Sequence, residues 1–324
     1  MDIRETIQKP IKSELDAFKQ FYSQQFISEV SLLNSALAHV AGTTGKMMRP
    51  MLLMLAAKSC GKINETTNYA AASLELLHTA SLLHDDVVDE SDMRRGLPSL
   101  NALYSNRIAI LTGDYLFSSA LFNASNTNNL KIIDGLSQLG RILSSGEMLQ
   151  LQLQKNGGYS EEIYMDVIRS KTASLFACCA RFGALSVGAD EATVERFEKF
   201  GSLLGICFQI VDDIFDYSDN NIGKPTGSDM REGKITLPAL YILANCKDEK
   251  ILEIRNKLDS SMSLDDDEIA LLIDYSNRYG GIEYAQSKIE ELKAQALDIL
   301  PSDMSDECRE ALEAYLEYVI SRKK

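Results

Sequence analysis

Two acidic clusters with the same internal spacing lie far apart in this chain of 324 residues. Residues four apart share a face of an α-helix, so the outer aspartates of each cluster would project together. Like charges at that spacing lower helix stability, and an unpaired carboxylate among apolar neighbours is costly. A divalent cation offsets this cost, and Mg²⁺ takes one or two carboxylates together with substrate phosphates. Both clusters have the form DDxxD within an apolar run, and their members are Asp85, Asp86, Asp89, Asp212, Asp213 and Asp216.

A solvated helix face is the alternative explanation for a single DDxxD motif. Two copies, both embedded in apolar sequence, favour a metal site instead. An EF-hand is excluded because its loop needs a Gly and a distal Glu at fixed offsets. The clusters therefore predict Mg²⁺-dependent chemistry on a phosphorylated small molecule.

Cations beside glycine-containing breaks would complete a diphosphate site. Arginine suits bidentate phosphate contact, whereas lysine acts as a point charge. His78 precedes Asp85 by two helical turns on the same face, which leaves a core role and a site role equally open. The basic candidates are Lys46, Arg49, Arg94, Arg95, Lys171, Lys224 and Lys234.

Composition narrows the class of partner and the compartment. The net charge of -14 argues against nucleic acid, because phosphate backbones attract basic surfaces. Residues 1–21 lack the apolar core of a signal peptide, and the apolar run Met51–Ala57 is far too short to span a membrane. None of the six cysteines forms a CxxC pair, as expected for free thiols in a reducing compartment. We therefore expect a cytoplasmic protein that touches membranes, if at all, from outside.

Helical periodicity dominates the chain, and convincing strands are missing. Near the C-terminus, Gly280 and Gly281 predict a helix boundary, and Ser263 is expected to cap a helix with an acidic first turn. With few Pro and Gly residues and no linker, the sequence predicts an all-α fold with one domain over residues 1–324. One apolar helical stripe is formed by Ile282, Ala285, Ile289, Leu292 and Ala296.

Three stretches together resemble the trans-isoprenyl diphosphate synthases, the polyprenyl synthetase family. They are residues 83–96, with the first acidic cluster and its trailing arginines, residues 209–216, and residues 223–238 with GKxxGxD and EGKxTLP patterns. The resemblance covers essentially the whole chain, and it is closest to the long-chain synthases of quinone side chains, such as octaprenyl diphosphate synthases. It implies a large helical bundle of the isoprenoid synthase type with a central active-site cavity, and a homodimer.

The resemblance also implies the reaction. Isopentenyl diphosphate would be condensed with farnesyl or geranylgeranyl diphosphate to give a long-chain all-trans polyprenyl diphosphate. Two or three Mg²⁺ ions would hold the allylic diphosphate as a leaving group, and no protein nucleophile is needed. One departure is that Met47 and Met48 stand where many members have a further basic residue.

Site roles follow from the resemblance position by position. The implied Mg²⁺ ligands are Asp85, Asp89 and Asp212, together with Asp216, and Asp86 and Asp213 support them in the catalytic set. The implied contacts of the allylic substrate are Arg94, Lys171, Thr172, Gln209, Lys224 and Lys234. The implied isopentenyl diphosphate site comprises Lys46, Arg49, His78 and Arg95.

Product length is predicted from the helix face before the first cluster. Ala80 and Ser81 are small where short-chain synthases tend to place bulky aromatics, and Leu77 lies one turn earlier. Small side chains there would leave a tunnel open, so we expect a product longer than farnesyl. Phe117, Phe122 or Met148 could supply its floor.

Other functions fit the sequence less well. A class I terpene cyclase shares the helical fold but carries a different second metal motif. A non-catalytic prenyltransferase subunit usually lacks one or more of the aspartates, and all six are present here. A geranylgeranyl diphosphate synthase remains the nearest alternative, because the tunnel floor is not defined by the sequence.

Overall fold

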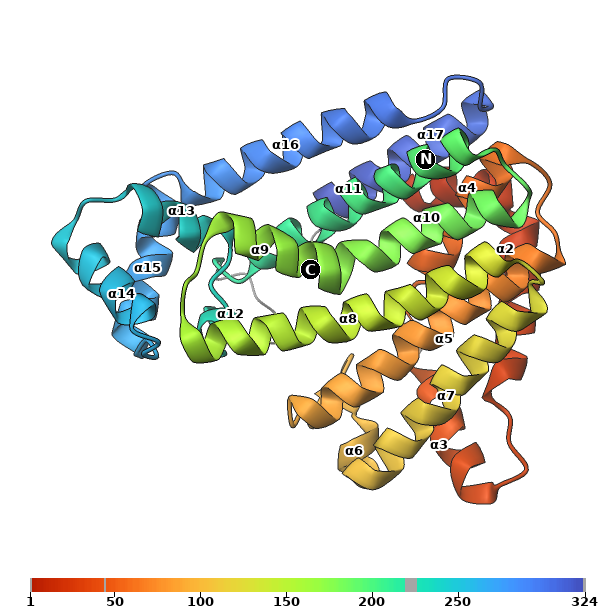
Figure 1. The fold of residues 1–324 in the computed structure, drawn as a ribbon, viewed down its shortest axis with the longest axis horizontal. Helices are drawn as coiled ribbons and strands as arrows, with labels where there is room; N and C mark the ends of the chain where they lie inside the picture. Colours follow the sequence, from red (N-terminus) through yellow and green to blue (C-terminus); the bar gives the residue numbers. More distant parts are fainter. Residues whose placement is uncertain (1, 44, 219–225, 323–324) are drawn as a thin grey trace. The chain divides into compact units, whose positions relative to one another are not determined.

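The computed structural model describes residues 2–43, 45–218 and 226–322, and these residues are predominantly helical (Figure 1). They group into two compact units, which are treated separately below. The first unit comprises residues 1–140, 178–198 and 301–315, and the second comprises residues 141–177, 199–300 and 316–324. Within the described ranges, none of the helices is both long and apolar enough to cross a membrane.

The elements are as follows. The first unit contains α1 (Ile3–Gln8), η1 (Lys9–Ile11), α2 (Lys12–Ser23), η2 (Gln24–Phe26), α3 (Ser31–Gly42), α4 (Met48–Cys60), α5 (Glu65–Val88), β1 (Met93–Arg94), β2 (Leu97–Pro98), α6 (Leu100–Leu103) and α7 (Asn106–Asn126). The second contains α9 (Glu161–Ile168), the π-turn η3 (Arg169–Ala173), α12 (Ser228–Arg231), α13 (Leu237–Asn245), α14 (Glu249–Asp259), α15 (Asp266–Arg278) and α16 (Gly281–Ile299). The remaining helices divide their residues between the units: α8 (Leu130–Asn156), α10 (Ser174–Ser186), α11 (Glu191–Phe215) and α17 (Asp306–Ser321).

Helix α5 carries the first acidic cluster at its C-terminal end. It begins at a capping box in which Asn64 and Thr67 satisfy each other's backbone N–H groups. Helix α7 packs along it, and Figure 1 shows the two side by side. The close approach needs Gly113, because a Cβ there would lie 2.4 Å from Nε2 of His84. Tight packing along α5 thus fixes the direction in which its last turn points.

In the second unit, two glycines allow helices to close on the π-turn η3. A Cβ at Gly205 of α11 would lie 2.6 Å from Cα of Ala173. A Cβ at Gly146 of α8 would lie 2.8 Å from Cβ of Ser170. Single π-turns inside helices occur frequently at functional sites, and this one carries Lys171 and Thr172.

The structure confirms several local predictions and corrects one. The stripe on α16 is buried at Ala285, Ile289, Leu292 and Ala296, and Gly280 adopts φ 89° just before it. The predicted cap at Ser263 is wrong, since the helix N-cap is Asp265 in a capping box with Glu268.

A short hairpin was not predicted from the sequence. Strands β1 and β2 pair antiparallel through Met93–Pro98 and Arg94–Leu97. The turn between them needs positive φ at two residues, and Arg95 and Gly96 supply φ 53° and 78°. Two-residue strands leave no alternating pattern, so sequence periodicity cannot reveal them. The assignment of residues 1–324 to one domain stays a prediction.

Candidate active site

Two aspartates of the first cluster offer carboxylates to solvent. Asp85 is half-buried in the last turn of α5, and Asp89 is exposed at its C-cap. One helical turn separates them, so their side chains project from the same face. The first and last aspartates of the motif, Asp85 and Asp89, are therefore the ones that solvent can reach.

The middle aspartate, Asp86, has a different environment. It is 1% exposed, and Nε of Arg94 donates to both of its carboxylate oxygens at 2.7 and 2.8 Å. Nη2 of Arg94 lies 2.6 Å from Oδ1 of Asp86. This buried pair ties the β1–β2 hairpin to α5. The predicted role of Arg94 at the allylic substrate stays a prediction.

Four of the predicted diphosphate-binding residues lie close together in the first unit. Burial lowers the pKa of His78 well below its ordinary value, and the cations of Arg49, Arg95 and Arg94 lower it further, so His78 is neutral. Arg95 donates through Nη1 to the carbonyl of Thr43 at 2.7 Å. Its guanidinium lies directly over Gly45, where a Cβ would be only 2.7 Å from Nη1.

Lys46 follows that glycine and is exposed. Arg49 is the second residue of α4 and faces the buried Glu75, with 3.8 Å between Nη1 and Oε2. The result is a basic surface around a neutral histidine. An isopentenyl diphosphate site in this position is therefore consistent with the local charges.

The second cluster lies at the C-terminal end of α11, and its aspartates differ sharply in exposure. The Asp212 side chain is 36% exposed, and its Oδ1 lies 2.8 Å from Nη2 of Arg322. Arg322 also donates to the carbonyl of Phe208 at 2.8 Å and stacks on that ring at 3.7 Å. A basic residue from the C-terminal segment thus lies on the predicted metal ligand.

Asp213 is buried inside a hydrogen-bond network. Oη of Tyr164 donates to its Oδ2 at 2.6 Å, and Nε2 of Gln209 donates to its Oδ1 at 2.8 Å. Thr172 in turn donates to Oε1 of Gln209 at 2.6 Å. Burial raises the pKa of Asp213 to about 8; the hydrogen bonds from Tyr164 and Gln209 oppose that shift, and the charges of Asp229 and Asp212 add to it.

Asp216 anchors the segment that follows the cluster. Its Oδ1 accepts from the backbone N–H and the hydroxyl of Ser228 at 3.0 and 2.9 Å, and its Oδ2 accepts from the backbone N–H of Asp229 at 3.0 Å. A carboxylate can accept about four hydrogen bonds, and these three contacts use most of that capacity. The proposed metal role of Asp216 remains a prediction.

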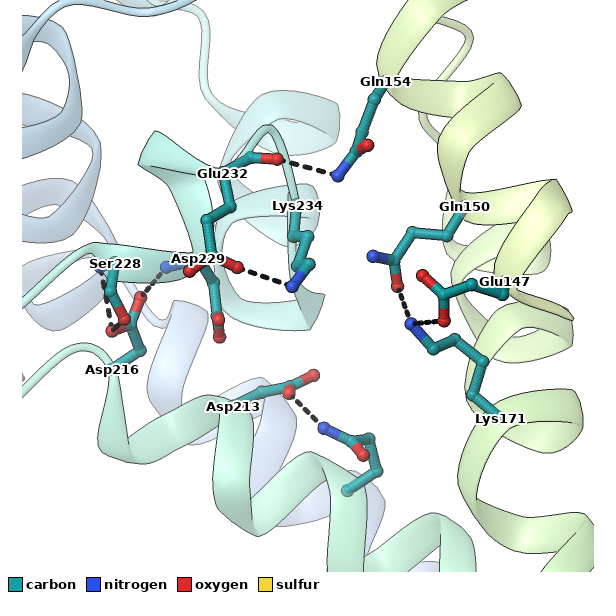
Figure 2. A network of polar contacts seen from close by, with 11 residues as sticks. Glu147, Gln150, Gln154, Lys171, Asp213, Asp216, Ser228, Asp229, Glu232 and Lys234 are labelled. Carbon is teal, nitrogen blue, oxygen red and sulfur yellow. Dashed lines mark hydrogen bonds and ion pairs between the residues drawn. The ribbon is translucent and has the colours of Figure 1, made fainter. Parts of the chain in front are cut away.

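A cavity of about 200 Å³ in the second unit is lined by predicted allylic-site residues. Figure 2 shows Glu147 and Gln150 of α8 pointing at Lys171, and Gln154 pointing at Glu232. Lys171 donates to Oε1 of Gln150 at 2.8 Å and pairs with Glu147 at 2.6 Å. Lys234 pairs with Glu232 at 2.6 Å. The predicted residues that line the cavity are Lys171, Thr172, Gln209, Asp213 and Lys234.

The donor set fits magnesium. Among the described residues, no three acidic, histidine or cysteine side chains converge to form a complete metal cage. Mg²⁺ needs no such cage, because it takes one or two carboxylates and fills its remaining positions with water and substrate phosphates. Asp85, Asp89 and Asp212 present oxygen ligands of the required kind at half-buried or exposed positions.

Some site residues were missed by the sequence analysis, and one falls outside the described ranges. Lys224 lies outside the residues that the structure describes. Glu147, Gln150 and Gln154 form a polar stripe at helical spacing on α8, a signal that was available in the sequence. Tyr164 and Arg322 gave no such signal, because their partners lie far away along the chain.

Comparisons with known proteins show the family of this chain. The sequence profile described as "Polyprenyl synthetase" matches residues 30–275. The all-trans-nonaprenyl-diphosphate synthase (geranyl-diphosphate specific) of Rhodobacter capsulatus is 35% identical over 307 residues, covering 93% of each protein. The chain therefore belongs to the polyprenyl synthetase family, and its fold is the all-α fold of that family.

Two solved structures add detail. The geranylgeranyl pyrophosphate synthase from Bacteroides thetaiotaomicron is 44% identical, covers 99% of this chain and 100% of its own, and superposes with a TM-score of 0.85. The polyprenyl synthase from Caulobacter crescentus CB15, solved with calcium and isoprenyl diphosphate, is 29% identical. It covers 99% of this chain and 98% of its own, with a TM-score of 0.88.

Proposed function

We propose that this protein is a Mg²⁺-dependent trans-prenyltransferase that adds isopentenyl diphosphate units to an allylic diphosphate. The observation that carries the proposal is the cavity beside the second acidic cluster, whose lining includes two lysines, two threonines and two glutamines. Cations and hydrogen-bond donors around a cavity with apolar walls suit a diphosphate attached to a hydrocarbon chain. The walls include Leu153, Ile163, Val167, Ile168 and Leu240.

Each unit supplies a distinct set of groups for this reaction. Lys46, Arg49 and Arg95 in the first unit would bind isopentenyl diphosphate. Lys171 and Lys234 in the second unit would bind the allylic diphosphate and stabilise it as it departs. Asp85, Asp89 and Asp212 would hold Mg²⁺, which would supply a Lewis acid for the departing diphosphate. Two or three ions are expected.

The apolar walls around these residues exclude water while the allylic cation exists. Attack by the isopentenyl double bond forms the new C–C bond, and the proton lost afterwards passes to the departed diphosphate. The chain itself needs to supply no nucleophile.

The product is proposed to be a long all-trans polyprenyl diphosphate, made from farnesyl or geranylgeranyl diphosphate and used for quinone side chains. Ala80 is 1% exposed and Leu77 is buried, whereas Ser81 is half-buried on α5. The second candidate is geranylgeranyl diphosphate, which the 44% identical structure favours. Incubation with each primer, followed by chromatography of the dephosphorylated product, separates the two.

A homodimer is proposed from the surface of α7. Several large apolar side chains on this helix are exposed and recur at helical spacing, which is typical of a protein interface. Light scattering after gel filtration should give twice the mass of one chain. In Phe122→Glu the measured mass should fall to that of a single chain. The exposed side chains are Ile110, Leu111, Phe117, Leu121 and Phe122.

The cytoplasm is the proposed compartment, with transient contact at a membrane surface when an apolar product leaves. The net charge of -14 does not favour binding of the chain to anionic lipids through a cluster of basic residues. Nucleic acid is not an expected partner.

The metal assignment is tested by single isosteric substitutions. Asp85→Asn and Asp212→Asn remove one carboxylate charge each and should lower the elongation rate at least about 100-fold, the scale of losing an electrostatic catalytic group. Asp267→Asn is the matched control, because Asp267 is exposed in the first turn of α15. Equal activity in all three variants would contradict the assignment.

A further inference from the structure

A tyrosine that the sequence did not single out lines the cavity and holds Asp213 of the second acidic cluster. Tyr164 is 8% exposed on α9, and its hydroxyl donates to Oδ2 of Asp213 at 2.6 Å. The same helical segment continues into the π-turn that carries Lys171 and Thr172. The contact therefore joins α9 and α11 beside the proposed allylic site.

The hydrogen-bond directions in this network are set by Asp213. Both oxygens of Asp213 accept hydrogen bonds in this arrangement, and the amide of Gln209 turns its Nε2 toward Oδ1 of Asp213. Its Oε1 then faces Thr172 and accepts the hydroxyl proton. With that proton engaged, Thr172 fixes the orientation of the Gln209 amide from the π-turn. Asp213, Gln209 and Thr172 are thus held in one connected arrangement beside the cavity.

Two donors hold Asp213 in this orientation, one on each oxygen. The Gln209 donor comes from the same helix, one turn earlier, and moves with it. Tyr164 supplies the donor from a different helix and is the one that fixes Asp213 relative to the π-turn. Gly205 permits the close packing of α11 on this turn, so a small shift has little room to be absorbed.

We propose that Tyr164 is a positioning residue that orders the allylic diphosphate site by holding Asp213, Gln209 and Thr172 in one hydrogen-bond arrangement. The inference rests on the proposed function and adds a residue to it. Tyr164 lines the same cavity as Lys171 and Thr172, but its hydroxyl proton is engaged by Asp213. It acts through Asp213, and its effect should therefore appear in the binding of the allylic substrate.

The test is Tyr164→Phe, which removes one hydroxyl and keeps the ring. The KM for the allylic diphosphate should rise about tenfold, because a lost hydrogen bond to a carboxylate costs binding energy of that order. The KM for isopentenyl diphosphate should stay within about twofold, because its proposed contacts belong to the first unit. Loss of folded enzyme alone would lower kcat and leave both KM values unchanged.

A matched control is a tyrosine of α16 that donates to a carboxylate on α9. Tyr284 donates to Glu161, the first residue of α9, at 2.8 and 3.0 Å from its two carboxylate oxygens. Tyr284→Phe removes the same kind of bond from the same helix away from the acidic cluster, and both KM values should remain as in the wild type. Thermal unfolding of both variants measures the structural cost separately.

A double-mutant cycle then tests whether Tyr164 acts through Asp213. In an Asp213→Asn background, Tyr164→Phe should change the allylic KM by less than about twofold, because coupled residues are non-additive. Additive effects, or an unchanged allylic KM in Tyr164→Phe, would overturn the inference while the wild type remains active. A wild type that incorporates no isopentenyl diphosphate would instead contradict the proposed function.

Discussion

Nη2 of Arg322 lies 2.8 Å from Oδ1 of Asp212, and the guanidinium stacks 3.7 Å above the Phe208 ring. The guanidinium of Arg322 therefore pairs with a carboxylate that would bind Mg²⁺ in the proposed reaction, and the two cations would compete for it. The pair is partly exposed, and such pairs contribute up to about 1 kcal/mol.

Removing this competition should make the metal easier to bind. Arg322→Gln should lower the Mg²⁺ concentration at half-maximal rate about two- to fivefold, the factor expected from an ion pair of that strength. A magnesium titration of the initial rate measures it. A higher requirement in the variant would show that Arg322 assists the bound state instead.

Product length should respond to the half-buried position on α5. Ser81→Phe places an aromatic ring at the proposed tunnel and should shorten the product, as read by reversed-phase chromatography. Ala80→Tyr should act in the same direction, with a larger stability cost, because Ala80 is 1% exposed and overpacking costs about 1–3 kcal/mol. Ser81→Ala is the control. An unchanged product in Ser81→Phe would place the tunnel elsewhere.

The π-turn should be sensitive to the glycine that packs against it. Gly205→Ala introduces a Cβ 2.6 Å from Cα of Ala173, and overpacking of this kind costs about 1–3 kcal/mol. The melting temperature should fall, and the KM for the allylic diphosphate should rise. Gly42→Ala has open space around the new methyl group and should change stability by less than about 0.5 kcal/mol. Equal melting temperatures would contradict the close packing described for α11.

Acid stability should depend in part on Glu14. Burial alone would raise its pKa, but the hydrogen bonds from the Lys58 ammonium, at 2.8 Å, and from Ser13 bring it below the ordinary value of 4.5. A lowered pKa stabilises the fold above the unfolded pKa, and this stabilisation is lost as the pH falls through the folded pKa. Glu14→Gln should cost up to about 1 kcal/mol at neutral pH. Urea unfolding should show the difference shrinking toward zero in acid; a constant difference would count against the pair.

The residues that could be predicted share a local signal. The DDxxD aspartates and the stripe on α16 are visible because helical spacing relates residue type directly to a face. The all-α fold follows from the same periodicity, and the family resemblance added the roles of Lys171, Thr172 and Gln209.

The remainder depends on contacts between distant segments. Asp86 and Arg94 pair because a turn with positive φ folds the hairpin back on α5, and the spacing of the residues does not encode that pairing. Likewise, the partners of Asp213 and Asp212 come from α9 and the C-terminal segment. Burial then makes the aspartates of one motif differ in exposure and raises the pKa of Asp213, although the sequence spacing of the two motifs is the same.

The most direct test of the central claim is incorporation of labelled isopentenyl diphosphate by the purified protein with Mg²⁺ and farnesyl diphosphate. The products would be dephosphorylated and resolved by chain length. We predict a ladder of intermediates that ends in one long all-trans product and disappears when the metal is chelated. No incorporation with either farnesyl or geranylgeranyl diphosphate would contradict the proposed function.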